Sequence, residues 1–591
     1  MRRDPYLIKK SVYLFPAIEV SVDVNALKLL HIIIDLRTQP TVYFNGKEIL
    51  RVKTQGLRYK SEWYGDCIEF MDPIENTSFF LGMYNNCLVC KGSFDCILNQ
   101  KNLQRLKITN YEFPNGNILI LPVKKYEPSY DIKELITVFD KIEDFFQPSY
   151  KWKHNAPILK LEGFNYLWAD SWVLHRINTF YPERHLSTKW ICACRNSSEL
   201  SNKISVWDTV HIIEDLKFYD LKRAEEQLRI LTDLYKSKPE EVFPPIISYS
   251  IIELSKLVGD KNICSNSMQW MDENLMWWEK YRYFSDVGLF GYKDMRVEDI
   301  AQETEQINSP RWHYQYNGEK WRKLPSKKTR NLVSVDLNAL MADYYQNLGV
   351  IALSKEDESL ARDYFDTAER LINAMHEVLW DDTEKFYFDY DLETNCIQPI
   401  YTSSSFWSLF GGCVFKQDLN SYIKHLTNPA KFWGLSIPSI AFDSPFYSQN
   451  FWAGPSWISL NYFIIVGLKR YNLGSLASQI GLKVLKYLEN SYYNYNKLFE
   501  FYNPLTISQQ PLKRIYRHTS PYPNYLGHVP IHAIFYYGLM KGTLLEDDFH
   551  MIPDWTQIKS QLEFELYYNN NKIMFKPERL KTKILELSRE Q

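Results

Sequence analysis

Apolar and polar residues alternate in short runs over the first part of the chain, which is the pattern of half-buried β-strands. Asn45-Gly46 stands between two of these runs, and Asn115-Gly116 marks a second turn further on. An Asn-Gly pair between apolar runs is a strong hairpin signal. We therefore predict a β-sandwich-like domain over residues 1–135. Its predicted strands cover residues 11–15, 31–36, 41–44, 49–52, 67–70 and 118–123.

Beyond this region the apolar residues recur at helical spacing. Residues 218–235, for example, place Leu221, Ala224, Leu228 and Leu231 on one helical face. Paired helices of this kind predict a mainly α domain over residues 136–545, an (α/α)6 toroid. An α-solenoid is the alternative, but no repeat of fixed period is visible. Further predicted helices cover residues 336–349, 359–379, 462–471 and 476–488.

Aromatic and Gly/Pro-rich loops interrupt the predicted helices, and such loops on one side of a scaffold commonly carry binding residues and chemistry. The polar tail over residues 546–591 predicts only a hairpin near residues 569–571. The predicted loops include Trp207-Asp208, Ser309-Pro310-Arg311, Gly454-Pro455 and Tyr522-Pro523.

Composition narrows the class of ligand. Aromatic residues make up 16% of the 591 residues, with 42 Tyr, 33 Phe and 17 Trp. Aromatic rings suit sugar sites because they stack on the apolar faces of pyranoses, although core packing is the preferred explanation for most of them. The net charge of −2 gives no support for binding to nucleic acid or to an anionic membrane.

The cysteines and the N-terminal residues bear on cellular location. No signal-peptide pattern opens the sequence, and the nine Cys are scattered and odd in number. Cys87 and Cys90 form a CxxC pair, but no second pair completes a zinc pattern, so we expect buried thiols and no metal or other cofactor. These features predict a cytoplasmic protein.

Several segments, in chain order, resemble the clan of inverting (α/α)6-barrel glycosidases. The resemblance is closest to mannosylglycerate hydrolase-like proteins and glycoside hydrolase family 63, which includes processing α-glucosidase; trehalases are more distant. The resemblance implies a saccharide or small glycoside as substrate. The segments that carry it are Trp207-Asp208, Phe243-Pro244-Pro245, Ser309-Pro310-Arg311-Trp312, residues 335–339, residues 451–457 and residues 499–506.

The resemblance also implies site residues. Inversion uses one carboxylic acid to protonate the leaving oxygen and one carboxylate to activate water, and the resemblance places the base at Glu500. Phe499 and Phe501 flank Glu500 and give it an apolar setting. The residues implied for substrate binding are Trp207, Asp208, Trp452, Trp457, Glu303 and Arg311, although core packing for Trp457 and an ion pair for Arg311 are competing interpretations.

The chain departs from the family pattern at the catalytic acid. The family's acidic loop reads Glu-Ser-Gly-x-Asp-x-Ser-x-Arg, and Ile307 occupies the position of its Asp. Glu305 replaces the Gly of that loop and is the candidate substitute acid, whereas Glu303 matches a Glu that the family already has. Ala453 stands where the family has an Arg in a second loop.

Three functional hypotheses therefore remain after sequence analysis. The first is an inverting glycoside hydrolase with Glu500 as base and Glu305 as a displaced acid. The second is a catalytically inactive carbohydrate-binding or scaffolding protein with a protein partner. The third is an enzyme of altered chemistry whose substrate has a leaving group that needs no proton.

Overall fold

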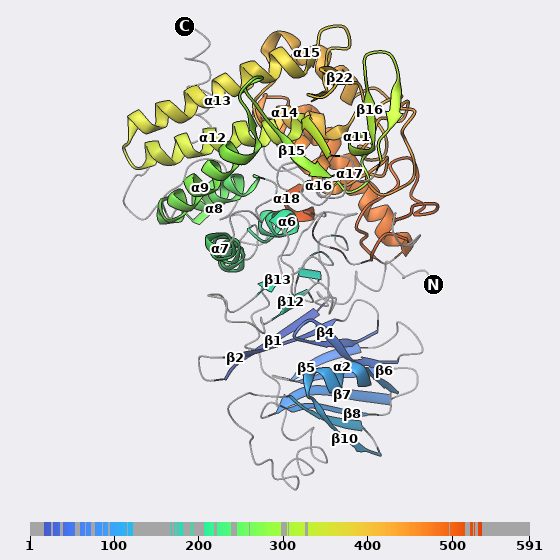
Figure 1. Ribbon diagram of the computed structural model, residues 1–591. Coiled ribbons are helices and arrows are strands. Elements are labelled where there is room, and N and C mark those ends of the chain that lie inside the picture. The colour runs from blue at the N-terminus through green and yellow to red at the C-terminus, as the bar shows by residue number, and fades with distance from the viewer. Residues whose placement is uncertain are drawn as a thin grey trace. The chain divides into compact units, whose positions relative to one another are not determined.

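The computed structural model describes most of residues 17–121, a few positions between 167 and 192, and most of residues 206–534 (Figure 1). The predicted strand at residues 11–15, Glu303, Glu305 and the tail at residues 546–591 lie outside the described residues. The chain divides into two compact units, a smaller N-terminal unit and a larger one that holds most of the helices. The expected boundary near residue 135 stays a prediction.

Two antiparallel sheets form most of the N-terminal unit, which also includes the two-stranded sheet of β12 (Thr179–Phe180) and β13 (Ile191–Cys192). Asn45 and Gly46 both have positive φ, 46° and 74°, and join β3 to β4 as the two-residue turn predicts. The first sheet has the order β1 (Ala17–Val24), β2 (Lys28–Asp35), β3 (Thr41–Phe44), β4 (Lys47–Val52) and β9 (Cys96–Leu98). The second has the order β10 (Thr109–Phe113), β11 (Gly116–Ile120), β8 (Cys87–Gly92), β7 (Thr77–Tyr84), β6 (Cys67–Asp72) and β5 (Lys60–Tyr64).

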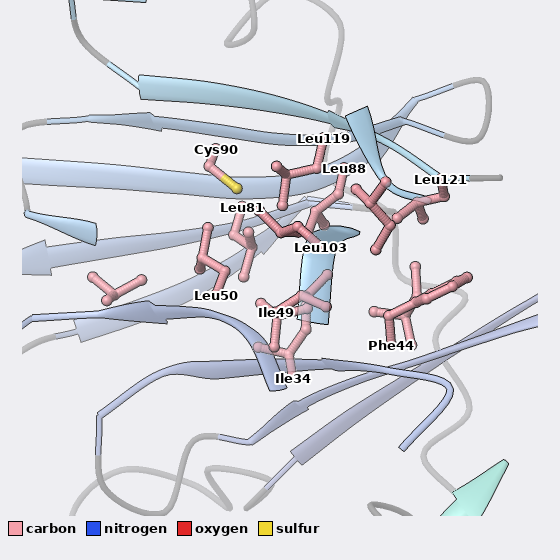
Figure 2. Packing of buried hydrophobic residues seen from close by; sticks show 14 of the residues in the cluster. Ile34, Phe44, Ile49, Leu50, Leu81, Leu88, Cys90, Leu103, Leu119 and Leu121 are labelled. Atoms are coloured by element: carbon pink, nitrogen blue, oxygen red, sulfur yellow. The ribbon is translucent and has the colours of Figure 1, made fainter. Parts of the chain in front are cut away.

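The two sheets share one apolar core (Figure 2). Ile34 and Ile49 come from the first sheet and Leu81 and Leu88 from the second, and all four are buried. Leu103, on the short helix α2 (Gln100–Leu106), joins the same cluster. Apolar side chains facing one another from two sheets form the layered core of a sandwich. The β-rich fold predicted for this region is therefore confirmed.

Two kinds of helix make up the larger unit. In α6 (Val206–Leu216) every residue is buried, and α12 (Val335–Ser354) and α16 (Ile458–Arg470) are buried over most of their length. By contrast, α13 (Glu358–Leu379) buries one stripe at helical spacing, including Ala361, Ala368 and Met375. A helix buried all round lies inside a protein, whereas a one-sided helix covers it. Buried and amphipathic helices therefore form an inner and an outer layer.

The inner helices form a closed ring within the described residues. Each contacts the next in the order α6, α8, α12, α14, α16 and α18, and α18 contacts α6 again. Successive inner helices are connected through outer helices, as α12 and α13 show side by side (Figure 1). This arrangement is the (α/α)6 toroid that the sequence predicts. The other helices of the ring and of its outer layer are α7 (Leu221–Ser237), α8 (Ile247–Val258), α9 (Lys261–Arg282), α14 (Trp407–Phe410), α15 (Lys416–Leu426), α17 (Gly474–Tyr495) and α18 (Ile531–Ile534).

A buried polar cluster joins three inner helices. Glu214 on α6 accepts hydrogen bonds from Ser250 on α8 at 2.8 Å and from Tyr462 on α16 at 2.7 Å. Lys217 donates to the same carboxylate at 2.5 Å. Because buried polar groups are costly unless they are paired, these bonds fix the order of the helices around the ring. None of the described helices is long and apolar enough to span a bilayer.

Two sequence predictions for this unit were wrong. Trp207 and Asp208 lie in the first turn of α6 rather than in a loop, and Pro310-Arg311 begins a short helix, α11 (Pro310–His313). The helical periodicity also gave no sign of a five-stranded sheet in this unit. Its order is β14 (Tyr283–Phe284), β15 (Leu289–Arg296), β18 (Thr329–Val333), β21 (Asp389–Asp391) and β22 (Cys396–Gln398).

Candidate active site

The site residues gather where the inner helices begin. Trp207 and Asp208 occupy the first turn of α6, Trp407 begins α14, and Trp457 caps the N-terminus of α16. The rings of Trp207 and Trp407 are stacked, with centroids 5.1 Å apart, so the N-terminal ends of α6 and α14 lie together. The N-terminus of a helix carries partial positive charge. This end of the ring therefore favours carboxylates and other oxygen acceptors.

Glu500 lies on the loop between α17 and α18 and is only 3% exposed. Its backbone N–H donates to Tyr522 O at 2.9 Å. Two residues further on, Tyr502 exchanges backbone hydrogen bonds of 2.8 and 2.9 Å with Ser456, next to Trp457. These bonds fix the Glu500 loop against the loop that precedes α16. The side chain predicted to be the base is thus buried and rigidly supported.

Arg514 is the cationic partner of Glu500. Its Nη1 donates to Glu500 Oε2, and the guanidinium lies 4.0 Å from the Tyr522 ring centroid and 4.7 Å from that of Phe451. Tyr522 N also approaches Glu500 Oε2, at 3.4 Å. Sequence analysis missed Arg514, because nothing in the spacing of residues 500 and 514 indicates that they meet.

Trp452 and Trp457 form a second stacked pair. Their ring centroids are 3.7 Å apart, the planes differ by 2°, and each residue is 1% exposed. Trp457 Nε1 donates to Phe451 O at 3.1 Å, and its ring also contacts Phe501. Trp457 is therefore packed between the Glu500 loop and its own loop. Its predicted role in substrate binding stays a prediction, as does that of Trp452.

Arg311 holds the segment that follows the acid position. It is 3% exposed and pairs with Asp336 at 2.8 Å and with Asp389 at 2.7 Å. Burial alone would raise the pKa of Asp336, but the Arg311 guanidinium outweighs it and holds that pKa below its usual value. Gln306 donates to Asp336 at 3.2 Å and accepts from Arg311 at 3.2 Å. These contacts agree with the interpretation of Arg311 as a member of an ion pair.

Asn308 joins this segment to the tryptophan loop. Its Nδ2 donates to Asn450 O at 2.9 Å, and its Oδ1 accepts from Trp452 N at 2.7 Å. Ile307, the neighbouring residue, which the sequence resemblance places at the acid position, is half-buried. Because Trp452 stacks on Trp457 and the Trp457 loop is bonded to the Glu500 loop, position 307 belongs to the same assembly as the predicted base. Glu305 and Glu303 lie outside the described residues.

Asp208 is held by the segment after Tyr522. Tyr525 OH donates to Asp208 Oδ1 and Oδ2 at 3.2 and 3.3 Å. Gly527 approaches so closely that a Cβ there would lie 1.7 Å from Asp208 Oδ1. Continuous contacts thus run from Asp208 through this segment to Glu500. Among the described residues, no group of three or more His, Cys, Asp or Glu is arranged to hold a metal ion.

A closed ring of buried helices covered by outer amphipathic helices is the fold of the (α/α)6-barrel glycosidases. The family model described as the mannosylglycerate hydrolase MGH1-like glycoside hydrolase domain matches residues 202–519, more than half of the chain. The chain belongs to this family. The resemblance noted in the sequence is thereby confirmed, and the chain is related to glycoside hydrolases.

Individual relatives match shorter regions. A mannosylglycerate hydrolase from Thermus thermophilus is 28% identical over 182 residues, 30% of this chain and 40% of that protein. A periplasmic trehalase from Escherichia coli is 25% identical over 232 residues, 36% of this chain and 39% of that protein. The crystal structure of a GH63 mannosylglycerate hydrolase from Thermus thermophilus in complex with Tris has a TM-score of 0.48 and 16% identity, covering 62% of this chain and 99% of that one. The chain thus matches about two fifths of the length of these curated relatives.

Proposed function

We propose that the protein is an inverting glycoside hydrolase that acts on an α-linked saccharide or small glycoside, with Glu500 as the general base. The observation that carries this proposal is the buried Glu500 carboxylate, held by Arg514 at the same end of the helical ring as Trp207 and Trp452. Because the chain spans only part of its relatives, their substrates do not decide which sugar is bound. The cytoplasm remains our proposed location.

Glu500 suits the base function for two reasons. A general base must be ionised, and an adjacent guanidinium favours the ionised carboxylate. A base must also be rigidly placed, because small displacements from the reacting water are costly. The backbone bond from Glu500 N to Tyr522 O at 2.9 Å and the Ser456–Tyr502 pair supply that rigidity.

The acid function is proposed for Glu305. Ile307 has no proton to donate, so a carboxyl group from another position must protonate the leaving oxygen. Glu305 lies two residues before Ile307 and next to Gln306, whose side chain is anchored to Arg311 and Asp336. Glu303 is the weaker candidate because it matches a Glu that the family already has in addition to its catalytic acid.

Two substrates separate the roles of these carboxyl groups. Glu305→Gln is expected to lower kcat/KM on an unactivated disaccharide by about 10²–10⁴-fold and to spare a 4-nitrophenyl glycoside, whose leaving group needs no proton. Glu500→Gln should abolish turnover of both, since water activation is still required. Glu319→Gln, in an exposed turn, is the matched control. Full activity of Glu305→Gln on the disaccharide would exclude it as the acid.

An inactive carbohydrate-binding protein is the second candidate, and the hydrocarbon side chain of Ile307 at the acid position favours it. Isothermal titration calorimetry against a panel of glucosides and mannosides tests binding apart from turnover. Binding that Trp207→Ala weakens, without hydrolysis of either substrate class, supports this candidate. Turnover of activated glycosides alone instead supports the third hypothesis, an enzyme that needs a good leaving group.

A further inference from the structure

The guanidinium of Arg514 lies between two aromatic rings and a carboxylate. The ring centroids of Tyr522 and Phe451 are 4.0 and 4.7 Å from its central carbon. The Arg514 side chain is 20% exposed, whereas that of Glu500 is 3% exposed. An arginine stacked on aromatic faces loses much of its conformational freedom, so its donors are aimed in a fixed direction. That direction is toward Glu500 Oε2.

The backbone beneath this contact is strained. Phe451 has φ of 50°, in the left-handed region that a bulky side chain rarely adopts. Its conformation is enforced from both sides, because Phe451 N donates to Lys513 O at 3.1 Å and Phe451 O accepts from Trp457 Nε1. Strain of this kind persists where the surroundings fix it and is concentrated at functional sites. Here it turns the Phe451 ring onto the Arg514 guanidinium.

We propose that Arg514 is a positioning residue for the glycosidase reaction, which holds the Glu500 carboxylate in one orientation from a platform formed by Phe451 and Tyr522. This inference rests on the proposed function of Glu500 as the base. Arg514 and the backbone N–H of Tyr522 reach the same carboxylate oxygen, so rotation of the Glu500 side chain is restricted from two directions. A fixed carboxylate presents a constant geometry to the attacking water.

The same contact accounts for one departure from the family pattern. The resemblance places an Arg where this chain has Ala453, two residues after Phe451. Lys513 and Asn450 pair as a parallel bridge, which brings Arg514 alongside the loop that contains Ala453. Arg514, about sixty residues further along the chain, thus supplies this loop with the guanidinium that Ala453 lacks.

Steady-state kinetics of Arg514→Gln and Arg514→Lys on 4-nitrophenyl α-glucoside and α-mannoside test the proposal. In Arg514→Gln we expect kcat to fall by about 10²-fold, as for a displaced reacting group, with little change in KM. The acid limb of the pH profile of kcat/KM should move to higher pH, since a carboxylate without its cation is protonated more easily. Arg514→Lys restores the positive charge, so the acid limb should return to its wild-type position. Only part of kcat should recover, because lysine lacks the planar guanidinium that stacks on the aromatic rings.

Arg322→Gln is the matched control, because Arg322 pairs with Glu393 at 3.3 Å on the exposed surface. This variant should keep the wild-type kcat and pH profile. A change in Arg514→Gln that is confined to KM, or an unmoved acid limb, overturns the proposal. A merely structural arginine would lower stability without moving that limb.

A double-mutant cycle separates failure of this inference from failure of the proposed function. Thermal unfolding of Arg514→Gln, Glu500→Gln and the double variant is measured on the full chain. We expect Arg514→Gln to lower Tm in the wild-type background and to have little effect once Glu500 is Gln. If the wild type hydrolyses no glycoside, the proposed function fails. The cycle then tests only whether Arg514 holds Glu500. Coupling between the two substitutions supports that contact, and additivity overturns the inference.

Discussion

Asn308 links two loops through a single amide side chain. It donates to one loop residue, Asn450, and accepts from the next but one, Trp452. An amide has both a donor and an acceptor, so it satisfies two backbone groups that the acceptor-only carboxylate of Asp could not satisfy together. The segment containing Ile307 is thereby held in register with the loop that contacts the predicted base.

His211 gives a pH dependence at the residue scale. Burial in α6 lowers the pKa of its ring to about 3, although its contacts with the carbonyl groups of Trp207 and Gly527 act in the opposite direction. The folded protein therefore leaves this ring neutral where the unfolded chain, with a pKa near 6.5, binds a proton. Stability from this residue is present above pH 6.5 and falls by about 1.4 kcal/mol per pH unit as the pH decreases toward 3.

Urea unfolding at pH 6.5 and pH 5, followed by tryptophan fluorescence, tests this prediction. Wild type should lose about 1.6 kcal/mol more than His211→Gln between the two values, because only the wild type has this titrating group. The variant will be less stable at both pH values, so the difference between the slopes is the informative quantity. Equal losses in the two proteins would contradict the low pKa of His211.

Side chains differ in how far sequence predicts them. Glu500 could be proposed from the sequence because its motif and its apolar neighbours are contiguous in the chain; its role as the base stays a prediction. Arg514 was not, because its contact with Glu500 depends on the paths of two irregular loops, which follow no hydrophobic period. The substitute acid proposed at Glu305 remains a prediction, since that residue lies outside the described part of the chain.

At the scale of helices, α16 packs so closely against α14 that position 467 of α16 must be a glycine. A Cβ at Gly467 would lie 2.7 Å from Phe410 N and 2.8 Å from Leu409 Cβ. Backbone cannot yield as a flexible side chain can, so Gly467→Ala should destabilise the protein by about 1–3 kcal/mol through overpacking. This loss outweighs the gain of about 1 kcal/mol in helix propensity.

Gly349→Ala is the matched control for this prediction. It lies within α12, and its added Cβ would lie 2.7 Å from the Phe365 ring, a side chain of the outer helix α13 that can move aside. Chemical denaturation of both variants should show the larger loss for Gly467→Ala. Equal losses would mean that the inner ring accommodates the methyl group as easily as the outer layer does.

The predicted boundaries of helices were most accurate where the hydrophobic periodicity was strongest. The helix predicted at residues 359–379 is α13, Glu358–Leu379, because an outer helix shows polar and apolar faces. The helix α6 was missed, and its residues Trp207-Asp208 were predicted to form a loop, because every residue of α6 is buried and no exposed polar face marks the helix. The sheet that contains β15 and β18 was missed because its partners are far apart in sequence.

At the scale of the whole chain, the fold class was predictable and the chemistry was not. Alternation of short apolar runs followed by paired amphipathic helices is enough to define a β-rich unit and a helical ring. Catalysis depends on the chemistry of individual residues rather than on the fold, and the sequence resemblance implies an acidic residue at the position that Ile307 occupies. The family membership of the chain leaves that choice to experiment.

Ile307→Asp tests whether the scaffold retains glycosidase geometry. The residue is half-buried in a turn where Ser309 N donates to Gln306 O at 3.0 Å and Trp312 Nε1 donates to the same oxygen at 2.9 Å. These bonds involve no atom of the Ile307 side chain, so the turn should survive the substitution. A carboxyl group at this position is expected to raise kcat on an unactivated disaccharide by about 10²–10⁴-fold.

Ile307→Asn is the control, because its side chain has nearly the same shape as Asp but cannot donate an acidic proton. Any increase seen with Asp but not with Asn belongs to proton transfer rather than to altered packing. The increase should disappear when Glu500→Gln is added, since the restored acid still needs a base. An increase that survives Glu500→Gln would instead place the base elsewhere in the ring. If Ile307→Asp gains nothing while the sugar still binds, the spacing of the two carboxyl positions no longer fits inversion, and the carbohydrate-binding candidate becomes the better account.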